Sequence, residues 1–319
     1  MFSKSKTAFV FPGQGSQKIG MGKEFLENSI TKELFEQADD ALGINLTKMM
    51  MFGEESDLSL TANTQPALLL TSYAAYKYLE SQMDEPLERM CKIVAGHSLG
   101  EYSALAVAGV FDFETALKVV RKRGEAMQAA VKDGEGAMAA VLGLTPVDID
   151  SIARNTGCFV ANDNSDGQVV LSGTMKAIDD ASNLAAEQGA KRIVRLPVSA
   201  PFHCPLMQPA AEVMANVLKS VSMADSVVPV VCNVTAEPEV NSQKLRDNLV
   251  TQVTGSVRWR ESMIYMANAG IEDVYELGTG KVLTGLAKRC DPRLKGLALN
   301  NPMCIDNLLE VLRSNTSVA

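Results

Sequence analysis

The strongest constraint on the fold of this chain is a serine between two glycines, at a point where an expected strand turns sharply into a helix. Residues 92–95 form a short apolar run typical of a buried strand, and residues 101–106 favour a helix. Between them stands Gly96-His97-Ser98-Leu99-Gly100, a G-x-S-x-G sequence in the strand-turn-helix context that gives this motif its meaning. Glycine at both ends permits a tight turn and close packing of the helix on the strand. The motif therefore predicts an exposed Ser98 at the tip of the turn.

Ser98 is a candidate nucleophile, although the pentapeptide alone is common and also fits an ordinary loop. A serine hydroxyl is a weak nucleophile and needs a base within hydrogen-bonding reach. The chain has only two histidines. We expect the His97 side chain to leave on the side opposite to Ser98 and to serve packing. His203 lies in the proline-rich segment 197–205, which is expected to be a loop, and it is the predicted general base.

The rest of the sequence alternates expected strands and helices. An apolar strand at residues 7–11 is followed by helices near residues 34–42 and 65–79 and then by the strand and helix around Ser98. Such alternation indicates a parallel sheet covered by helices. After residue 196 it resumes, with strands at 227–232 and 273–277 and helices at 259–269, 282–289 and 307–313.

A different pattern occupies residues 136–196. Strands are expected at residues 138–142, 158–161, 169–172 and 191–196, and helices from Thr145 to Arg154 and from Thr174 to Gly189. This βαββαβ order is that of a ferredoxin-like unit. We therefore predict an α/β fold in which residues 1–135 and 197–319 form a discontinuous, hydrolase-like large subdomain and residues 136–196 form an inserted ferredoxin-like small subdomain.

Charge and cysteine content exclude several kinds of protein. The net charge of −8 speaks against non-specific binding of nucleic acid. The six cysteines form no C-x-x-C pair, which favours reduced thiols over disulfides or a zinc site, and Cys204, beside His203, is interpreted as a packing residue. No apolar run approaches a membrane span, and the first residues lead into a strand without a signal-peptide segment. We expect a cytoplasmic protein without a metal or membrane association.

Two glycine-containing loops resemble phosphate loops but fail the corresponding motifs. Residues 13–18 and 278–283 both lack the third glycine of a dinucleotide fingerprint, and neither is a Walker loop. In the first loop, the Gln14 N–H could be an oxyanion donor opposite the N–H of Leu99, but a simple strand-to-helix turn explains the residues equally well. For the second loop, the tight turn is the favoured interpretation.

Arg123 falls at the edge of the apolar stripe of the helix that begins at Phe113. A guanidinium facing inward needs a partner, and its planar fork matches a carboxylate. An internal salt bridge, or an aliphatic stem that carries the charge to solvent, is the simpler interpretation. A substrate with a free carboxylate is the functional alternative.

Taken together, the motifs resemble the malonyl-CoA:acyl-carrier-protein transacylases of type II fatty acid synthesis over essentially the whole chain. The matching segments are Phe11-Pro12-Gly13-Gln14-Gly15-Ser16-Gln17, Gly96 to Tyr102, Arg123-Gly124, Asn162 and Asn164 before Gly167, Ser199 to His203, and Gly278 to Leu283. Thr279 stands where family members often carry proline or alanine.

The resemblance implies roles for individual residues. Ser98, activated by His203, would take malonyl from coenzyme A and pass it to the pantetheine thiol of acyl carrier protein by double displacement. The Gln14 and Leu99 amides would form the oxyanion hole, and Arg123 would bind the malonyl carboxylate. The main-chain carbonyl of Gln252 would orient the histidine in place of the acid of an ordinary triad. Phe202 would bind substrate and crowd the acyl α-carbon. Gln65, Asn162 and Asn164 would either line the substrate-binding cleft or support the residues that line it.

Partners and rival functions follow from the same comparison. The expected partners are malonyl-CoA and an acidic acyl carrier protein, no cofactor is expected, and the chain is expected to be a monomer. Docking of an acidic partner on this acidic protein requires a basic rim, for which Lys191, Arg192, Lys281, Lys288 and Arg289 are candidates. A serine hydrolase shares every step up to the acyl-enzyme and is the nearest rival. A scaffold without catalytic activity is a third interpretation.

Overall fold

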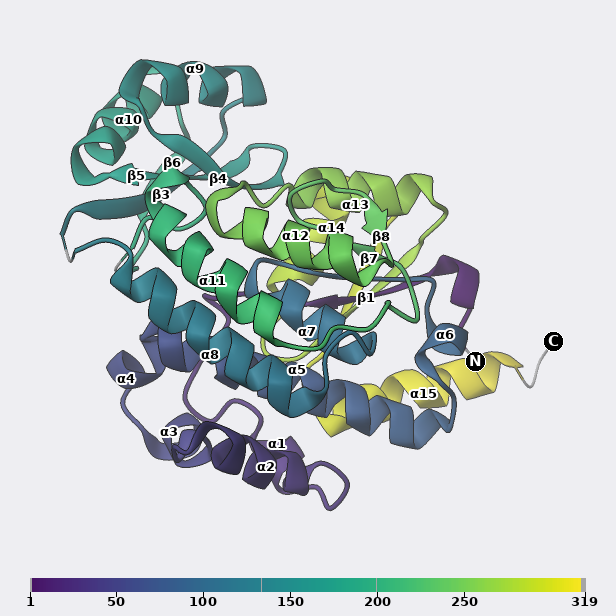
Figure 1. The fold of residues 1–319 in the computed structure, drawn as a ribbon. Helices are drawn as coiled ribbons and strands as arrows, with labels where there is room; N and C mark the ends of the chain where they lie inside the picture. Colours follow the sequence, from purple (N-terminus) through teal and green to yellow (C-terminus); the bar gives the residue numbers. More distant parts are fainter. Residues whose placement is uncertain (1, 133, 199, 317–319) are drawn as a thin grey trace.

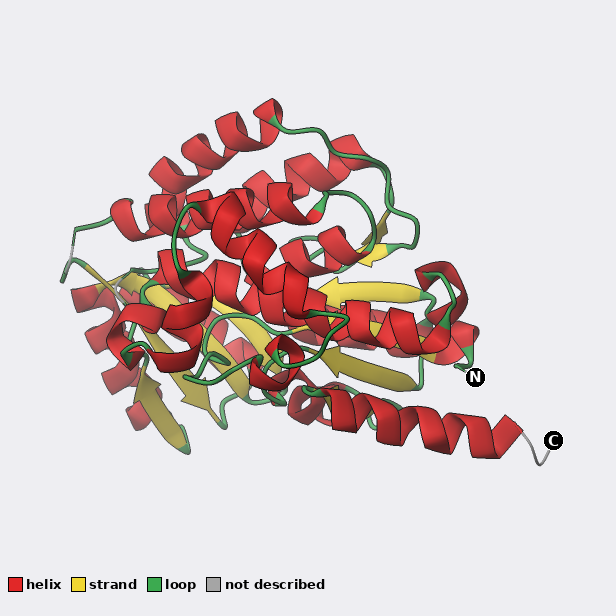
Figure 2. Cartoon of the chain, turned by 90° about the horizontal axis from the view of Figure 1, so that it is seen from below, coloured by secondary structure: helices red, strands yellow, loops and turns green. Residues whose placement is uncertain are grey.

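The computed structural model describes residues 2–132, 134–198 and 200–316. Its larger sheet has the strand order β10-β9-β1-β2-β7-β8, and all neighbouring pairs are parallel except the short β7–β8 pair. Figure 1 labels β1, β7 and β8 of this sheet, and Figure 2 shows strands in yellow with helices in red around them. The strands are β1 (Thr7–Phe11), β2 (Ile93–Gly96), β7 (Val230–Val231), β8 (Pro238–Glu239), β9 (Asp273–Leu277) and β10 (Lys295–Leu299). β1 and β2 are buried at every position, as expected for a parallel sheet covered on both faces.

The side chains of β1 alternate between two hydrophobic cores. Phe9 and Phe11 belong to a large core, whereas Ala8 and Val10 belong to a second core with Trp259. On the side of the large core lie α5 (Thr61–Met83), α7 (Leu99–Val107), α8 (Phe113–Ala129), α11 (Gln208–Ser220) and α12 (Ser242–Thr254). On the other side lie α13 (Trp259–Asn268) and α14 (Val282–Cys290). The predicted parallel sheet covered by helices is therefore confirmed.

Shorter helices complete the large subdomain. A helical lobe next to α5 contains α1 (Lys23–Leu26), α2 (Lys32–Leu42), α3 (Leu46–Phe52) and α4 (Glu55–Ser59) (Figure 1). The remaining elements are α6 (Leu87–Met90), α15 (Pro302–Thr316) and the 3₁₀ turns η1 (Lys4–Lys6) and η2 (Pro205–Met207). Among the described residues, no helix combines the length and the hydrophobicity that crossing a membrane requires.

The small subdomain is a separate antiparallel sheet with the order β4-β5-β3-β6 (Figure 1). Its strands are β3 (Gly136–Leu142), β4 (Phe159–Ser165), β5 (Gln168–Thr174) and β6 (Arg192–Arg195), and α9 (Pro146–Thr156) and α10 (Met175–Glu187) pack on it. The Thr145 and Thr174 side chains cap the two helices, as expected. This strand order and connectivity are ferredoxin-like, so the predicted fold class is confirmed for this unit too.

Backbone contacts join β4 of the small sheet to Val257, in the segment between α12 and α13 of the large subdomain. Asn162 of β4 forms a parallel bridge to Val257, and the Asp163 N–H donates to the Val257 carbonyl at 2.9 Å. Arg260 of α13 binds the Asp163 carboxylate through Nε and Nη2 at 2.7–3.0 Å. The bridge carries Asn162 from the inserted subdomain to the edge of the large one.

Several elements differ from the sequence prediction. α5 extends from Thr61 to Met83, beyond the predicted 65–79, because tertiary packing buries polar residues of its first turns, including Thr64. The helices α11 and α12 and the edge strand β10 were not predicted. The sequence of α12 is polar and β10 is short and largely exposed. For α11 a signal was available, because Ala210, Ala211, Met214 and Leu218 form an apolar stripe at helical spacing. The predicted strand 227–232 shortens to Val230–Val231.

Candidate active site

The turn between β2 and α7 holds Ser98 in a strained backbone conformation. Ser98 has φ 52° and ψ −108°, a region that residues other than glycine rarely adopt. A Cβ on Gly96 would lie 1.9 Å from the Gly100 backbone, and a Cβ on Gly100 would lie 2.1 Å from the Phe11 carbonyl oxygen. The two glycines therefore allow α7 to approach both β2 and β1, and this approach raises the Ser98 hydroxyl into a cavity.

His203 approaches Ser98 from the loop after the small subdomain. Its Nε2 lies 2.7 Å from Ser98 Oγ, and its Nδ1 lies 2.8 Å from the Gln252 carbonyl oxygen and 3.2 Å from that of Gly255. Because carbonyl oxygens only accept, Nδ1 carries the proton and Nε2 is left to accept one from Ser98. Burial, with a further effect of the Arg123 charge, lowers the pKa of His203 from 6.5 to about 3. The imidazole is thus neutral at physiological pH, the form a general base requires.

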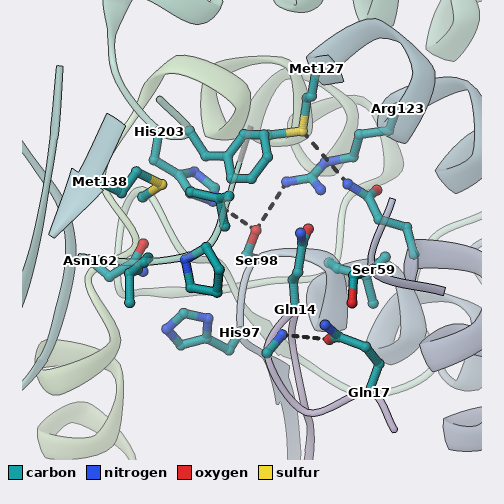
Figure 3. A pocket seen from close by; sticks show the side chains of 17 residues that line it. Gln14, Gln17, Ser59, His97, Ser98, Arg123, Met127, Met138, Asn162 and His203 are labelled. Atoms are coloured by element: carbon teal, nitrogen blue, oxygen red, sulfur yellow. Dashed lines mark hydrogen bonds between the residues drawn. The ribbon is translucent and has the colours of Figure 1, made fainter. Parts of the chain in front are cut away.

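Arg123 reaches the same hydroxyl from α8. Its Nη2 lies 3.1 Å from Ser98 Oγ and 2.8 Å from Gln252 Oε1, and the residue is only 1% exposed (Figure 3). Its guanidinium packs on the Tyr102 ring, 5.3 Å from the centroid. Within the described part of the chain, no carboxylate lies within 4.0 Å of Arg123, and Nε has no acceptor. The internal salt bridge considered above is therefore not formed there, and the buried cation keeps an unused donor.

The predicted oxyanion donors lie at the carboxyl ends of neighbouring strands. Gln14 follows β1 and Leu99 begins α7 after β2, and both residues line the cavity with Ser98. A Cβ on Gly13 would lie 2.4 Å from the His97 carbonyl oxygen, so glycine lets the two loops touch. Among the described residues, no acceptor pairs with the Gln14 or Leu99 N–H. These amides are free to bind an oxygen atom.

The cavity around Ser98 has a volume of about 310 Å³. Gln65, Asn162 and Phe202 line it, as do Met127 of α8 and Met138 of β3, so both subdomains contribute walls (Figure 3). Gln65 Nε2 donates to Met127 Sδ at 3.7 Å, while its Oε1 and the Oδ1 of Asn162 are buried without a partner among the described residues.

His97 and Asn164 form a hydrogen-bonded pair, in which Asn164 has the supporting position that the resemblance allowed for it. Asn164 does not line the cavity; its Oδ1 lies 2.8 Å from His97 Nε2, behind the His97 ring. His97 itself lines the cavity beside Ser98, contrary to the expectation that it would leave on the far side. The positive φ of Ser98 explains the difference, because it breaks the alternation of side chains that a continuing strand would impose.

Asn233 and Glu101 are site residues that the sequence analysis missed. The Ser98 N–H donates to Asn233 Oδ1 at 2.7 Å, and Glu101 accepts from the Asn233 N–H at 3.1 Å. Asn233 directly follows the strand expected at residues 227–232, and a polar residue in that position was the available signal, since such residues gather at the carboxyl edge of a parallel sheet.

The candidate basic residues lie apart along two elements. Lys191 and Arg192 are exposed at β6, and Lys281, Lys288 and Arg289 are exposed at the two ends of α14. Arg289 Nη1 donates to Gln168 Oε1 at 3.0 Å, which joins the end of α14 to β5.

Comparison with known proteins agrees with this fold and site. The sequence model of the acyl transferase domain family matches residues 8–284. The malonyl CoA-acyl carrier protein transacylase of Bacillus subtilis (strain 168) is 43% identical over 99% of this chain and 100% of its own length, and that of Escherichia coli (strain K12) is 44% identical over 95% and 99%. The crystal structure of the acyl-carrier-protein S-malonyltransferase from Bartonella henselae superposes with a TM-score of 0.93 at 46% identity, covering 96% of this chain and 99% of that one.

The match to the acyl transferase domain family over residues 8–284 places this chain among the acyltransferases by class, and the serine turn, the histidine and the inserted lobe are consistent with that class. Within that class, the chain belongs to the malonyl CoA-acyl carrier protein transacylase family, which confirms the resemblance seen in its motifs.

Proposed function

We propose that this protein moves a malonyl group from coenzyme A to the pantetheine thiol of an acyl carrier protein through an ester on Ser98. The single observation that carries the proposal is the 2.7 Å contact between Ser98 Oγ and a His203 imidazole whose other nitrogen is held by carbonyl oxygens. The identity of the acyl group, malonyl, and of its two carriers, coenzyme A and acyl carrier protein, is inferred from the names of the relatives.

In the first half-reaction, Ser98 Oγ attacks the carbonyl carbon of the malonyl thioester and its proton passes to His203 Nε2. The oxygen that becomes negative accepts hydrogen bonds from the Gln14 and Leu99 N–H groups, which have no acceptor among the described residues. When the carbon–sulfur bond breaks, the coenzyme A thiolate takes the proton from His203. The product is malonyl-Ser98 and free coenzyme A.

In the second half-reaction, the carrier-protein thiol gives its proton to His203 and its sulfur attacks the ester carbonyl. The Ser98 oxygen leaves and recovers the proton, which returns the enzyme to its starting state. Throughout both steps, the Gln252 carbonyl holds the proton on Nδ1 and so keeps Nε2 available. No cofactor is needed in this sequence, because each step moves only one proton and one acyl group.

Selection of a carboxylated acyl group is assigned to Arg123. Arg123 lines the cavity beside the nucleophile and has no carboxylate partner among the described residues, so its guanidinium can pair with the terminal carboxylate of malonyl, whereas a general esterase requires an apolar pocket there. The Phe202 ring in the cavity wall crowds the acyl α-carbon. This arrangement favours a malonyltransferase over an esterase of broad specificity.

Carrier protein and cellular location belong to the same proposal. A related malonyl-transacylase, 39% identical with a TM-score of 0.91 over 96% of this chain, has been solved in complex with a type II PKS acyl-carrier protein. We expect this chain to act as a monomer in the cytoplasm, with the acidic carrier docking on lysines and arginines at β6 and α14.

The test is intact-mass analysis of the protein after malonyl-CoA and then after carrier protein. The wild type should gain one malonyl group and lose it to the carrier thiol, whereas Ser98→Ala should gain none while its melting temperature stays within a few degrees. Loss of the group to water as fast as to the carrier would make the protein a hydrolase. Unaltered labelling of Ser98→Ala would refute the mechanism.

A further inference from the structure

Glu101 is a buried carboxylate directly beneath the nucleophile turn, and the proposed reaction gives it no task. It lies in the first turn of α7 and is only 1% exposed. Its Oε2 accepts from Gln252 Nε2 at 2.8 Å and from the Asn233 N–H at 3.1 Å, while Oε1 has no partner among the described residues. A carboxylate in a dry interior is costly, so its presence requires a compensating role.

Asn233, the first residue fixed by Glu101, spans the serine turn. Its Oδ1 accepts from the Ser98 N–H at 2.7 Å, and its Nδ2 donates to the Gly96 carbonyl oxygen at 2.7 Å. The side chain thus bonds the last residue of β2 and the nucleophile at the same time. It holds Ser98 at its unusual φ of 52°.

Gln252, the second residue fixed by Glu101, also forms hydrogen bonds to Ser98, Arg123 and His203. Its Nε2 also donates to the Ser98 carbonyl oxygen at 3.0 Å, and its Oε1 accepts from Arg123 at 2.8 Å. Its own main-chain carbonyl accepts from His203 Nδ1 at 2.8 Å. One amide side chain therefore stands between a buried acid and a buried guanidinium while its backbone orients the base.

We propose that Glu101 is a positioning residue that takes the part of the acid in a Ser-His-acid triad, but acts indirectly. Its hydrogen bonds fix Gln252, which orients His203, and Asn233, which holds Ser98. The inference rests on the proposed function, because it assigns Glu101 a part in Ser98 acylation. In an ordinary triad the acid contacts the imidazole itself. Here it contacts the residue whose carbonyl contacts the imidazole.

Glu101 holds its two partners through a hydrogen-bond acceptor oxygen and does not need a full negative charge to do so. Both donors reach the same Oε2, and a proton would reside on the unpartnered Oε1, so the two hydrogen bonds survive in either protonation state. Burial raises the pKa of Glu101 to about 7 against the opposing effect of these two bonds, which fits a carboxyl group that is neutral part of the time. Glutamine at this position keeps one such acceptor oxygen, and alanine removes it.

A second buried glutamate provides a matched control. Glu276, at the end of β9, is 0% exposed, accepts from the Thr284 N–H at 2.7 Å and from the Thr284 hydroxyl through Oε2, and has an unpartnered Oε1 among the described residues. It anchors the start of α14 and contacts neither Ser98 nor His203. Truncation of Glu276 therefore reproduces the loss of a buried carboxylate without touching the proposed positioning unit.

The experiment measures single-turnover formation of malonyl-Ser98 by rapid-quench intact-mass analysis for wild type, Glu101→Ala, Glu101→Gln and Glu276→Ala, with melting temperatures for each. The amplitude reports the folded, competent fraction, and the rate constant reports the geometry of the site. We expect Glu101→Ala to keep the amplitude near one ester per folded chain and to lower the rate constant about 100-fold, the effect of a misplacement of about 1 Å. Glu101→Gln should recover at least about tenfold of that loss, and Glu276→Ala should lower the melting temperature with an unchanged rate constant.

The outcomes separate this inference from the proposed function. A wild type that forms no ester refutes the proposed function itself. If the wild type forms the ester and Glu101→Ala matches its rate constant, or loses only amplitude in step with its melting temperature as Glu276→Ala does, Glu101 is merely structural and the inference is overturned. A Glu101→Gln rate constant as low as that of Glu101→Ala also overturns it, because charge rather than the acceptor oxygen would then be responsible.

Discussion

Replacement of Arg123 by alanine is the sharpest test of how the site recognises its acyl group. The guanidinium is 1% exposed, so its pairing with a substrate carboxylate would escape the solvent screening that reduces exposed ion pairs to about 0–1 kcal/mol. Removing one partner of a buried, hydrogen-bonded charge pair costs about 3–4 kcal/mol. At about 1.4 kcal/mol per factor of ten, kcat/KM for malonyl-CoA should fall about 100- to 1,000-fold.

A comparison of two acyl donors distinguishes charge recognition from general damage. Propionyl-CoA carries a methyl group where malonyl-CoA carries its carboxylate, so it gains nothing from Arg123. We expect Arg123→Ala to process propionyl-CoA at least as well as the wild type does, because the variant lacks a buried cation that has no carboxylate partner among the described residues. The assay is the release of coenzyme A during acylation, measured for each donor at several concentrations.

Lys122 supplies the control on the same helix. Its side chain is 61% exposed and pairs with Glu125 at 2.9 Å on the surface of α8, so Lys122→Ala should leave both donors unaffected. An equal fall for malonyl-CoA and propionyl-CoA in Arg123→Ala would refute the reasoning. It would mean that the guanidinium serves Ser98 and Gln252 in the free protein rather than the substrate.

Two further predictions concern the turn and its buried acid. Gly100→Ala should lower the free energy of unfolding by about 1–3 kcal/mol and the rate of acylation at least tenfold, because the new Cβ would lie 2.1 Å from the Phe11 carbonyl oxygen. The control is Gly285→Ala in α14, where a new Cβ would have nothing within 4 Å. This variant should be neutral or more stable by up to about 1 kcal/mol. For Glu101, the folded-state pKa of about 7 lies above the ordinary 4.5, so the folded state binds an extra proton between these values. The stability that Glu101 contributes is complete below about pH 4.5 and is lost as the pH rises through 7. Over this range the wild type should therefore lose stability relative to Glu101→Gln, by at most about 1.4 kcal/mol per pH unit. Urea unfolding of both proteins at several pH values measures the difference.

Contrary results would be informative in both cases. Equal effects of the two glycine substitutions on acylation would show that α7 can move away from β1 without loss of geometry. A wild type that gains stability relative to Glu101→Gln between about pH 5 and 7 would mean that Glu101 is stabilised as the anion, against the direction argued from its burial.

Much of the fold could be predicted because its patterns are local. The apolar runs of β1 and β2, the threonine caps of α9 and α10 and the βαββαβ order are all read from residues close together in sequence. β10 and α12 escaped prediction, since an exposed edge strand and a polar helix carry weak periodicity. Packing against the rest of the protein determines such elements.

The site, too, has features that the sequence predicted and features that only the tertiary structure shows. The serine, both glycines and the choice of His203 followed from a motif and a count of two histidines, because chemistry restricts which residue types can act. The orientation of His97 did not follow, because the backbone conformation at Ser98 decides to which side the neighbouring His97 side chain turns.

By itself, then, the sequence determined an α/β chain with an inserted lobe, a serine at a tight turn and one candidate base. Only the tertiary structure decided that Arg123 faces the serine without a carboxylate partner among the described residues, and that Glu101, Asn233 and Gln252 join beneath it. The physical reason is that hydrogen bonds between α7, α12 and the end of β7 join residues more than a hundred positions apart, and their directions depend on how the helices pack on the sheet.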